Sequence, residues 1–512
     1  VVVPDTFRAY AEQLAALRRA EGLRVEVATA EAIANEFGGG IADPRAFRDF
    51  LRMLYLRAAP GTRGLRYALF FGDGHFNFRR IGSSGETLLA NWIPPFETEE
   101  TFSPLSSYTS DDYFGLLDEN EGTWSYSSGV TERVDIGIGR LNVQTRVDAE
   151  AVVAKIQAYE DPQRHGAWRT QYTLAADDGP RGSSGSATDN DLHAKNANDV
   201  GDIVETQTPE LNLRKIYAMN YARQYSVRYT VPVAHQTILD ALNDGTLVFN
   251  YSGHGSPNAL ADETLFSRED IGLLDNLDRL PVFVTATCSF GRWDIDNRQS
   301  AAELVTTASA GGAIAAFSTL RLVYTSGDST NLNPGLNRRF NLELVRRDTT
   351  TGLPPRLGDA ILITKQYAVG YQDNGRKFNL LGDPSLRFGL PPLEAIIETV
   401  NGVDVTAIPD SLADSLAVPL RALDLVTVTG SVRDPRGNPL PSFSGTATVT
   451  AYDADRQVAI PYRQYFLSPT YTVSERMWRG EVPVTGGRFT AQFVVPRDIA
   501  YANRRGRIAA YV

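Results

Sequence analysis

The sequence has little of several residue patterns that define common protein classes. It contains one cysteine, Cys288, so no intramolecular disulfide can form and cysteine usage does not report the redox compartment. No apolar run approaches the roughly 18 residues that a membrane-spanning helix requires. No basic run is present and the formal net charge is -11, which argues against a nucleic-acid partner, because phosphate binding needs clustered lysine and arginine.

Three catalytic signatures are also missing from the sequence. It has no G-x-S-x-G elbow, no P-loop and no H-E-x-x-H pair, which removes the usual motifs of serine hydrolases, nucleotide-binding enzymes and zinc peptidases. The chain begins at Val1 without an initiator methionine or a signal peptide, and it ends in a segment with strand character. We therefore expect it to be a fragment of a longer, exported precursor.

The patterns that are present predict three structural units. With 512 residues, the chain is too long for one hydrophobic core. Alternating strands and helices predict a first α/β subdomain over 1–140 and a catalytic α/β subdomain over 141–390, packed side by side. At Pro391 the pattern changes to short strands separated by turns. Residues 391–512 are predicted to form an immunoglobulin-like β-sandwich that is truncated at its end.

Two matching constructions carry the candidate chemistry. The apolar strand 247–251 is followed by His254 between two glycines, and the apolar strand 281–287 is followed directly by Cys288. In an open parallel sheet, chemistry collects beyond the carboxyl ends of the strands, so neighbouring strands would bring the two side chains together. An imidazole next to a thiol can accept its proton and return it to the leaving amine. The backbone N–H groups of Gly255 and Cys288 are candidates for an oxyanion hole.

Each of these residues also has a simpler interpretation. A lone cysteine at the end of a buried strand is more often a small core residue than a nucleophile. A histidine between glycines could be an ordinary loop residue. The joint arrangement favours catalysis because each residue supplies what the other lacks.

Longer sequence stretches make a family resemblance specific. They are YSGHGS (251–256), TATCSFGRWD (285–294), SDDYFGLLD (110–118), DIGIGRLNVQT (135–145), NLLGDPSLRFG (379–389) and the GDG turn (72–74). Together they resemble the gingipain family of cysteine peptidases, in the caspase-like clan, over nearly all of residues 1–390. The stretches at 110–118 and 285–294 are most similar to the PorU-type sortases of the type IX secretion system. The resemblance implies a caspase-like α/β/α catalytic region with Cys288 as nucleophile and His254 as base.

The resemblance also implies further residues. The family often has an acid that orients the histidine, and Asp178 is the first candidate here, with Asp177 as its alternative. Asp189 and Asp191 lie close enough in the sequence to compete. No cofactor is required, but Asp294 and Asp296 could bind a structural calcium ion, as loops in some gingipains do. They could equally form a turn and a helix start, since the spacing is not that of an EF-hand.

The function that the resemblance implies is that of a sortase at the bacterial outer-membrane surface. Such an enzyme removes the C-terminal sorting domain from type IX cargo and passes the new carboxyl end, through a thioester, to water or to a lipopolysaccharide amine. The implied partners are protein substrates with a sorting domain and other outer-membrane secretion components. Two alternatives stay open: a secreted gingipain-like endopeptidase, and an inactive scaffold or adhesin that retains the fold.

Overall fold

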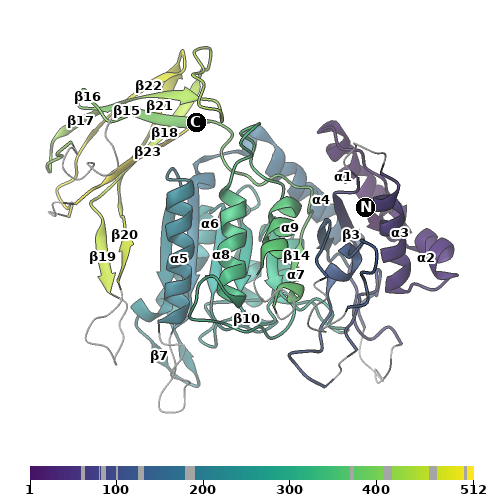
Figure 1. Ribbon diagram of the computed structural model, residues 1–512. Coiled ribbons are helices and arrows are strands. Elements are labelled where there is room, and N and C mark those ends of the chain that lie inside the picture. The colour runs from purple at the N-terminus through teal and green to yellow at the C-terminus, as the bar shows by residue number, and fades with distance from the viewer. Residues whose placement is uncertain are drawn as a thin grey trace.

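The fold is that of a computed structural model of the chain. It describes residues 1–58, 64–79, 81, 88–99, 102–124, 132–178, 191–368, 374–406, 418–459, 470–500 and 504–512. Two bodies are visible, an α/β region and a β-domain at one end of it (Figure 1). In the described part of the chain, no helix combines the length and apolarity needed to cross a bilayer.

The α/β region is built on one ten-stranded sheet with the order β2-β1-β3-β4-β14-β13-β12-β9-β5-β6. The first five strands in this order are parallel to one another: β2 (Ala28–Thr29), β1 (Val2–Val3), β3 (Tyr67–Phe71), β4 (Gly137–Leu141) and β14 (Phe378–Leu381). The other five are also mutually parallel: β13 (Ala315–Thr319), β12 (Val282–Ala286), β9 (Val248–Ser252), β5 (Gln171–Ala176) and β6 (Asn212–Tyr217). The two blocks meet at the antiparallel β13–β14 pair, so their strands point in opposite directions.

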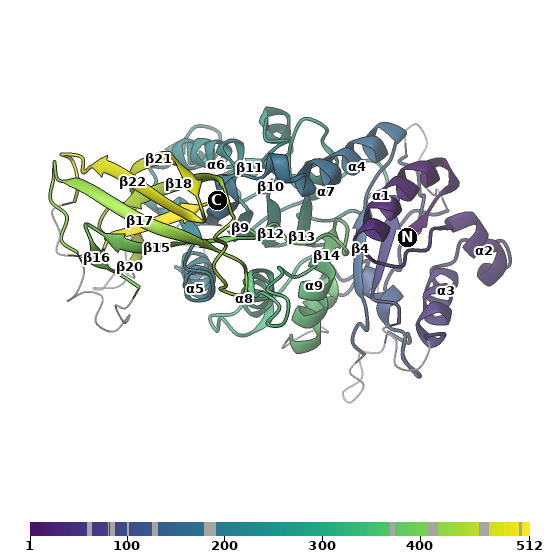
Figure 2. The ribbon, with the colours of Figure 1, turned by 90° about the horizontal axis from the view of Figure 1, so that it is seen from above.

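Helices cover both faces of this sheet (Figure 2). One face carries α1 (Arg8–Ala20), α4 (Arg146–Glu160), α6 (Pro232–Asp244) and α7 (Ala301–Thr307). The other carries α3 (Pro44–Leu56), α5 (Leu192–Gln207), α8 (Leu332–Val345) and α9 (Leu357–Tyr367), while α2 (Ala30–Gly38) packs at the end of the molecule. The central strands are buried on both faces, which explains their continuous apolar sequences.

The sheet is continuous across the two α/β units expected from the sequence. β14 lies at 378–381, far along the chain, yet it pairs with β4 from the first unit. Parallel pairing of strands so distant in sequence requires a long crossover, here one that contains the whole second block. The predicted α/β/α architecture is confirmed, and the structure adds that β14 joins its two halves.

The C-terminal β-domain contains no helix among its described residues. Its seven-stranded antiparallel sheet has the order β16-β15-β17-β22-β21-β18-β23, and β23 also pairs with β15. The strands are β15 (Glu394–Val400), β16 (Val403–Asp404), β17 (Leu425–Arg433), β18 (Gly445–Tyr452), β21 (Arg476–Thr485), β22 (Arg488–Val494) and β23 (Arg507–Tyr511). The predicted change to an antiparallel, sandwich-like β-domain is thus confirmed.

Both bodies also contain short two-stranded pairs. The pairs are β7 (Gln224–Tyr225) with β8 (Tyr229–Thr230), β10 (Ala259–Leu260) with β11 (Phe266–Ser267), and β19 (Arg456–Ala459) with β20 (Thr470–Val473). The first two pairs follow β6 and β9 in the chain and belong to the catalytic region. The β19–β20 pair belongs to the β-domain and extends away from it along α5 (Figure 1).

Candidate active site

His254 and Cys288 follow adjacent parallel strands at equivalent positions. β9 and β12 pair in register, with Ser252 opposite Ala286, so each candidate residue lies two positions beyond a paired strand end. The Gly253 N–H donates to the carbonyl of Ala286 at 3.3 Å, which extends the contact past the strands. The His254 side chain is exposed, and Cys288 is partly buried. The structure therefore brings the predicted pair to one edge of the sheet, which we call the rim.

The two glycines beside His254 are required by close contacts. A Cβ atom on Gly253 would lie 2.3 Å from the Tyr251 hydroxyl and 2.4 Å from the Asp177 Cβ. A Cβ atom on Gly255 would lie 2.5 Å from the Thr287 Oγ1 and 3.3 Å from the Cys288 carbonyl oxygen. The segment thus runs in direct contact with the end of β5 on one side and with the cysteine loop on the other.

The backbone of His254 is held at three points. Its N–H donates to Asp177 Oδ2 at 2.9 Å, and its carbonyl accepts from the Tyr251 hydroxyl at 2.7 Å and from the Ala261 N–H at 2.9 Å. Each bond comes from a buried residue. The imidazole therefore projects to the surface from a fixed main chain.

The two acids proposed to orient the histidine take different partners. Asp177 is buried and accepts hydrogen bonds from the backbone of His254 and of Asp178, the latter at 2.8 Å. Burial raises the pKa of Asp177 to about 6, against the lowering effect of these bonds and of His254. Asp178 forms an ion pair with Arg223. Asp177 thus contacts the His254 main chain directly and is also bonded to the Asp178 N–H; which acid orients the imidazole stays a prediction.

Three other acidic residues were considered or lie near His254, and each has a different position. The buried Glu263 shares a cluster with Asp177 and Asp178, in which carboxylate oxygens lie within 4.8 Å of one another. Asp191 precedes α5 and makes no side-chain cap. Asp189 lies outside the described residues.

A second histidine, which was not predicted from the sequence, lies beside the site. His193 is buried in the first turn of α5, and its ring packs edge-on against that of His254 with centroids 5.2 Å apart. The order of strand, loop and helix in the sequence could have predicted the position of His193. A helix that follows a parallel strand begins at the carboxyl edge of the sheet, which is the edge that carries His254.

The thiol of Cys288 lies in a partly buried setting. Its Sγ is 3.9 Å from the carbonyl oxygen of Val323, a weak hydrogen bond in which the thiol is the donor. Burial raises the pKa of the Cys288 thiol above its ordinary value. Because a carbonyl oxygen can only accept, this contact favours the protonated thiol, and deprotonation requires a base.

Hydrogen bonds from the segment before β14 hold the loop that contacts the thiol. The Lys377 Nζ donates to the carbonyl of Leu322 at 3.0 Å, and the Asn374 side chain bonds both the N–H and the carbonyl of Tyr324. Directly after the cysteine, Ser289 adopts a left-handed backbone with φ 55° and donates its N–H to the Arg321 carbonyl. The cysteine turn and the loop after β13 thus hold each other in place.

The proposed oxyanion donors lie on neighbouring backbones. The close approach of Gly255 to the Cys288 carbonyl places the two residues side by side across the rim. Backbone N–H groups from both could then converge on one substrate oxygen, as an oxyanion hole requires. This role of Gly255 and Cys288 stays a prediction.

The predicted calcium ligands, Asp294 and Asp296, are bonded to other side chains. Asp294 is buried and pairs with Arg321 and, at 3.6 Å, with Arg292. Asp296 accepts from the Asn77 Nδ2 at 2.7 Å. Arginine partners compensate the Asp294 charge without a cation, and calcium binding at Asp294 and Asp296 stays a prediction.

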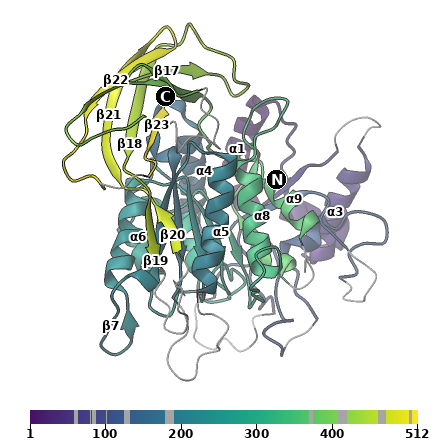
Figure 3. The same cartoon turned by 60° about the vertical axis from the view of Figure 1, so that its left-hand side comes forward.

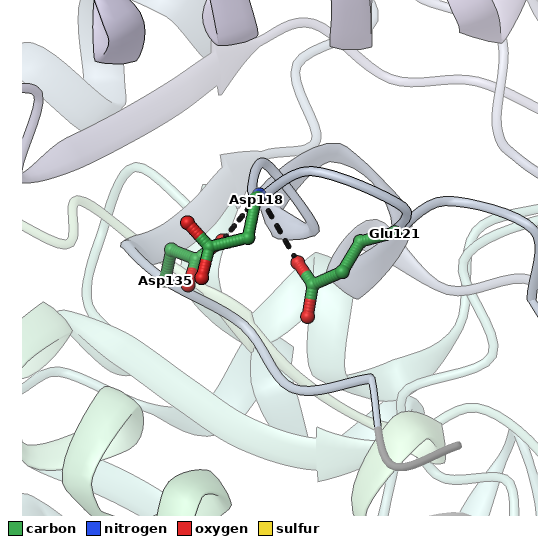
Figure 4. A group of neighbouring side chains, drawn as sticks. All are labelled: Asp118, Glu121 and Asp135. Carbon is green, nitrogen blue, oxygen red and sulfur yellow. Dashed lines mark hydrogen bonds between the residues drawn. The ribbon is translucent and has the colours of Figure 1, made fainter.

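Carboxylates in the described residues gather closely enough to share an ion in two other places. One is the cluster beside His254, and the other joins Asp118, Glu121 and Asp135 (Figure 4). In the latter, the Asp118 N–H donates to both neighbouring carboxylates at 3.2 Å. Burial and the nearby Asp135 raise the pKa of Glu121 to about 7. A proton shared between these two acids therefore relieves their repulsion.

Comparisons with known proteins agree with this architecture. The family model described as peptidase family C25 matches residues 1–389. No curated protein sequence matches the chain. The structure is similar to a complex of the Porphyromonas gingivalis RgpB pro- and mature domains, at TM-score 0.56 and 18% identity, covering 99% of this chain and 98% of that one.

Two further solved structures are similar. That of the Arg-specific cysteine proteinase gingipain R (RgpB) matches at TM-score 0.54 and 17% identity, covering 99% of this chain and 96% of that one. That of dimeric latent PorU from Porphyromonas gingivalis has TM-score 0.44 and 21% identity and covers 100% of this chain and 41% of that one. At the identity of the RgpB matches, the likeness establishes the fold, which is the one predicted from the sequence motifs.

Proposed function

Because the chain belongs to peptidase family C25, we propose that it is a cysteine peptidase in which Cys288 is the nucleophile and His254 is the general base. One observation supports these roles above the others. The in-register β9–β12 pair brings the only thiol of the chain and an exposed imidazole to the same edge of the sheet. In α/β proteins, the residues that carry out chemistry lie beyond the carboxyl ends of adjacent parallel strands.

The site residues supply each step of peptide cleavage. His254 accepts the thiol proton, and the thiolate of Cys288 attacks the scissile carbonyl carbon to give a tetrahedral oxyanion. The C–N bond then breaks, and the imidazolium passes its proton to the departing amine, which leaves a thioester. The carboxylate of Asp177, which accepts from the His254 backbone N–H, stabilises the imidazolium electrostatically between these two transfers.

The fate of the thioester distinguishes hydrolysis from transfer. Water releases a free carboxylate, whereas a primary amine attacks the thioester carbon and forms a new amide, returning the proton to the site. We propose transfer to an amine on lipopolysaccharide, with type IX cargo as substrate, at the bacterial outer-membrane surface. The support for this finer assignment is the PorU-like sequence at 110–118 and 285–294.

A defined cargo assay tests this proposal. A type IX cargo protein is incubated with the chain and an amine nucleophile, and the products are weighed by mass spectrometry beside a Cys288→Ala control. Cleavage at the sorting-domain junction with an amine-joined product supports a sortase. Hydrolysis at scattered basic sites would replace that proposal with the second candidate.

The second candidate is an endopeptidase of the secreted gingipain type. It is favoured by the fold match to RgpB, which extends over nearly the whole of both chains. That relative is described as Arg-specific, so peptides with arginine before the scissile bond are the substrates to compare. Alkylation of Cys288 separates both enzymes from an inactive scaffold, because a scaffold would show no His254-dependent reactivity.

A further inference from the structure

An arm of the C-terminal β-domain lies against the catalytic region. We use "the arm" for the β19–β20 pair, which leaves the β-domain and runs along α5 (Figure 3). β20 lies beside β6, the edge strand of the ten-stranded sheet. A sheet edge presents unpaired backbone groups, and covering it is one way to protect it.

The inner face of the arm is part of the catalytic core. Tyr471 is 6% exposed and belongs to the same hydrophobic cluster as β5, β9 and β12. Its ring packs on that of Tyr217, the last residue of β6, with centroids 4.6 Å apart. Val458 and Val473 pack against the same cluster. The arm is therefore built into the catalytic region.

The arm also fixes the chain where it leaves β6. The Asn220 Nδ2 donates to the Tyr471 hydroxyl, and Asn220 ends the 3-10 turn Ala218–Asn220. Three residues later, Arg223 forms its ion pair with Asp178 at the rim. A short segment, 218–223, thus has the arm at one end and the buried acids at the other.

The acids complete a connection to the candidate base. The Asp178 N–H donates to one oxygen of Asp177, and the other oxygen accepts from the His254 N–H. Removing a charged partner from a buried carboxylate is costly, so loss of Arg223 would perturb Asp178 and the residue bonded to it. Apart from the covalent segment between Asn220 and Arg223, every step from the arm to His254 is a direct contact.

We propose that Tyr471 is a positioning residue for His254, acting through the 218–223 segment and the buried acids. The inference rests on the proposed function, because it concerns the base of that reaction. It assigns to the β-domain a part in catalysis: the arm keeps Arg223 on Asp178 and thereby keeps the His254 backbone in place. Cys288 follows β12, and the loop that contacts its thiol is held by Lys377, so we expect the arm not to position the thiol.

The arm provides its own matched control. Thr472 points to the opposite face of β20, where its hydroxyl accepts from the Gln457 Nε2 at 2.8 Å. Thr472→Ala therefore changes the same strand without touching the catalytic region. Tyr471→Phe keeps the ring on Tyr217 and removes only the contact with Asn220.

Hydrogen–deuterium exchange on the full chain tests the connection without a substrate. With Tyr471→Ala, backbone exchange in 218–223 and in 252–255 rises by about tenfold, because the hydrogen bond to Asn220 and the ring contact with Tyr217 are both lost. Thr472→Ala leaves both segments unchanged, and Tyr471→Phe gives an intermediate rise. Unchanged exchange in 252–255 with Tyr471→Ala, or an equal rise with Thr472→Ala, would overturn the inference.

Kinetics separate positioning from general loss of structure. Tyr471→Ala lowers kcat for peptide cleavage about tenfold, because the same two contacts of Tyr471 are lost, and leaves KM nearly unchanged. Alkylation of Cys288 at pH 10, where the base is not needed, stays at the wild-type rate. In the Arg223→Gln background, Tyr471→Ala adds no further loss, because both act through one ion pair. Multiplying losses, or slowed alkylation, would overturn the inference.

The two proposals fail in different ways. If the wild-type chain shows no Cys288-dependent cleavage, the proposed function fails, and the exchange result still decides whether the arm controls the His254 segment. If cleavage is present but insensitive to Tyr471, the positioning role fails alone.

Discussion

Gly255→Ala is predicted to damage the active site by a defined steric contact. The new Cβ would lie 2.5 Å from Thr287 Oγ1, a separation below 3.0 Å that real Cβ atoms essentially never show, so the Thr287 side chain or one of the two backbones has to shift. Overpacking of this kind typically costs about 1–3 kcal/mol. A displacement of about 1 Å between reacting groups can lower the rate about 100-fold.

The expected result is therefore a large loss of activity with a modest loss of stability. We expect kcat/KM for a peptide substrate to fall about 100-fold, by the displacement argument. Gly272→Ala is the matched control, since nothing lies within 4 Å of its added Cβ, and it should keep full activity.

A second variant tests the contact itself. Thr287→Ala removes both side-chain atoms nearest to the new methyl group, so the Gly255→Ala/Thr287→Ala double variant should recover part of the lost activity. Activity and melting temperature are measured for all four variants. Full activity in Gly255→Ala, or no recovery in the double variant, would refute the assigned closeness of the histidine and cysteine loops.

Three further predictions concern the dyad and a buried acid. Cys288→Ala and His254→Ala should each abolish cleavage while changing the melting temperature little, as measured by peptide turnover and calorimetry. Because burial raises the pKa of Cys288, its alkylation by iodoacetamide should still be increasing with pH above the ordinary thiol pKa near 8.5, and a plateau at pH 7 would contradict this. Burial and the neighbouring Asp73 raise the pKa of Glu303 well above its ordinary value. Its protonated form therefore stabilises the fold below pH 4.5, and that stability is lost as pH rises through the raised pKa. Glu303→Gln should reduce the decrease in the free energy of unfolding between pH 5 and 8, measured by urea denaturation at each pH.

Local sequence patterns were sufficient to predict that His254 and Cys288 lie at one edge of the sheet. The strands before His254 and Cys288 are short, apolar and buried on both faces, and side chains just beyond such strands meet at one edge of a parallel sheet. The family match over residues 1–389 confirms the resemblance drawn from the motifs.

The remaining features depend on contacts between distant segments. Whether Asp177 or Asp178 contacts the histidine cannot be read from alternation, because β5 ends at Ala176 and the chain then turns. His193 comes to the site from a helix, and Tyr471 comes from another domain. The pairing of β14 with β4 likewise joins residues separated by most of the catalytic region, which no local periodicity encodes.

The central claim is that Cys288 carries the acyl group during the reaction. The most direct test is mass spectrometry of the chain quenched in acid during turnover of a peptide substrate, followed by digestion. We expect the acyl mass on the peptide that contains Cys288, its removal by hydroxylamine, and its absence in Cys288→Ala. Acylation at another residue, or undiminished cleavage by Cys288→Ala, would contradict it.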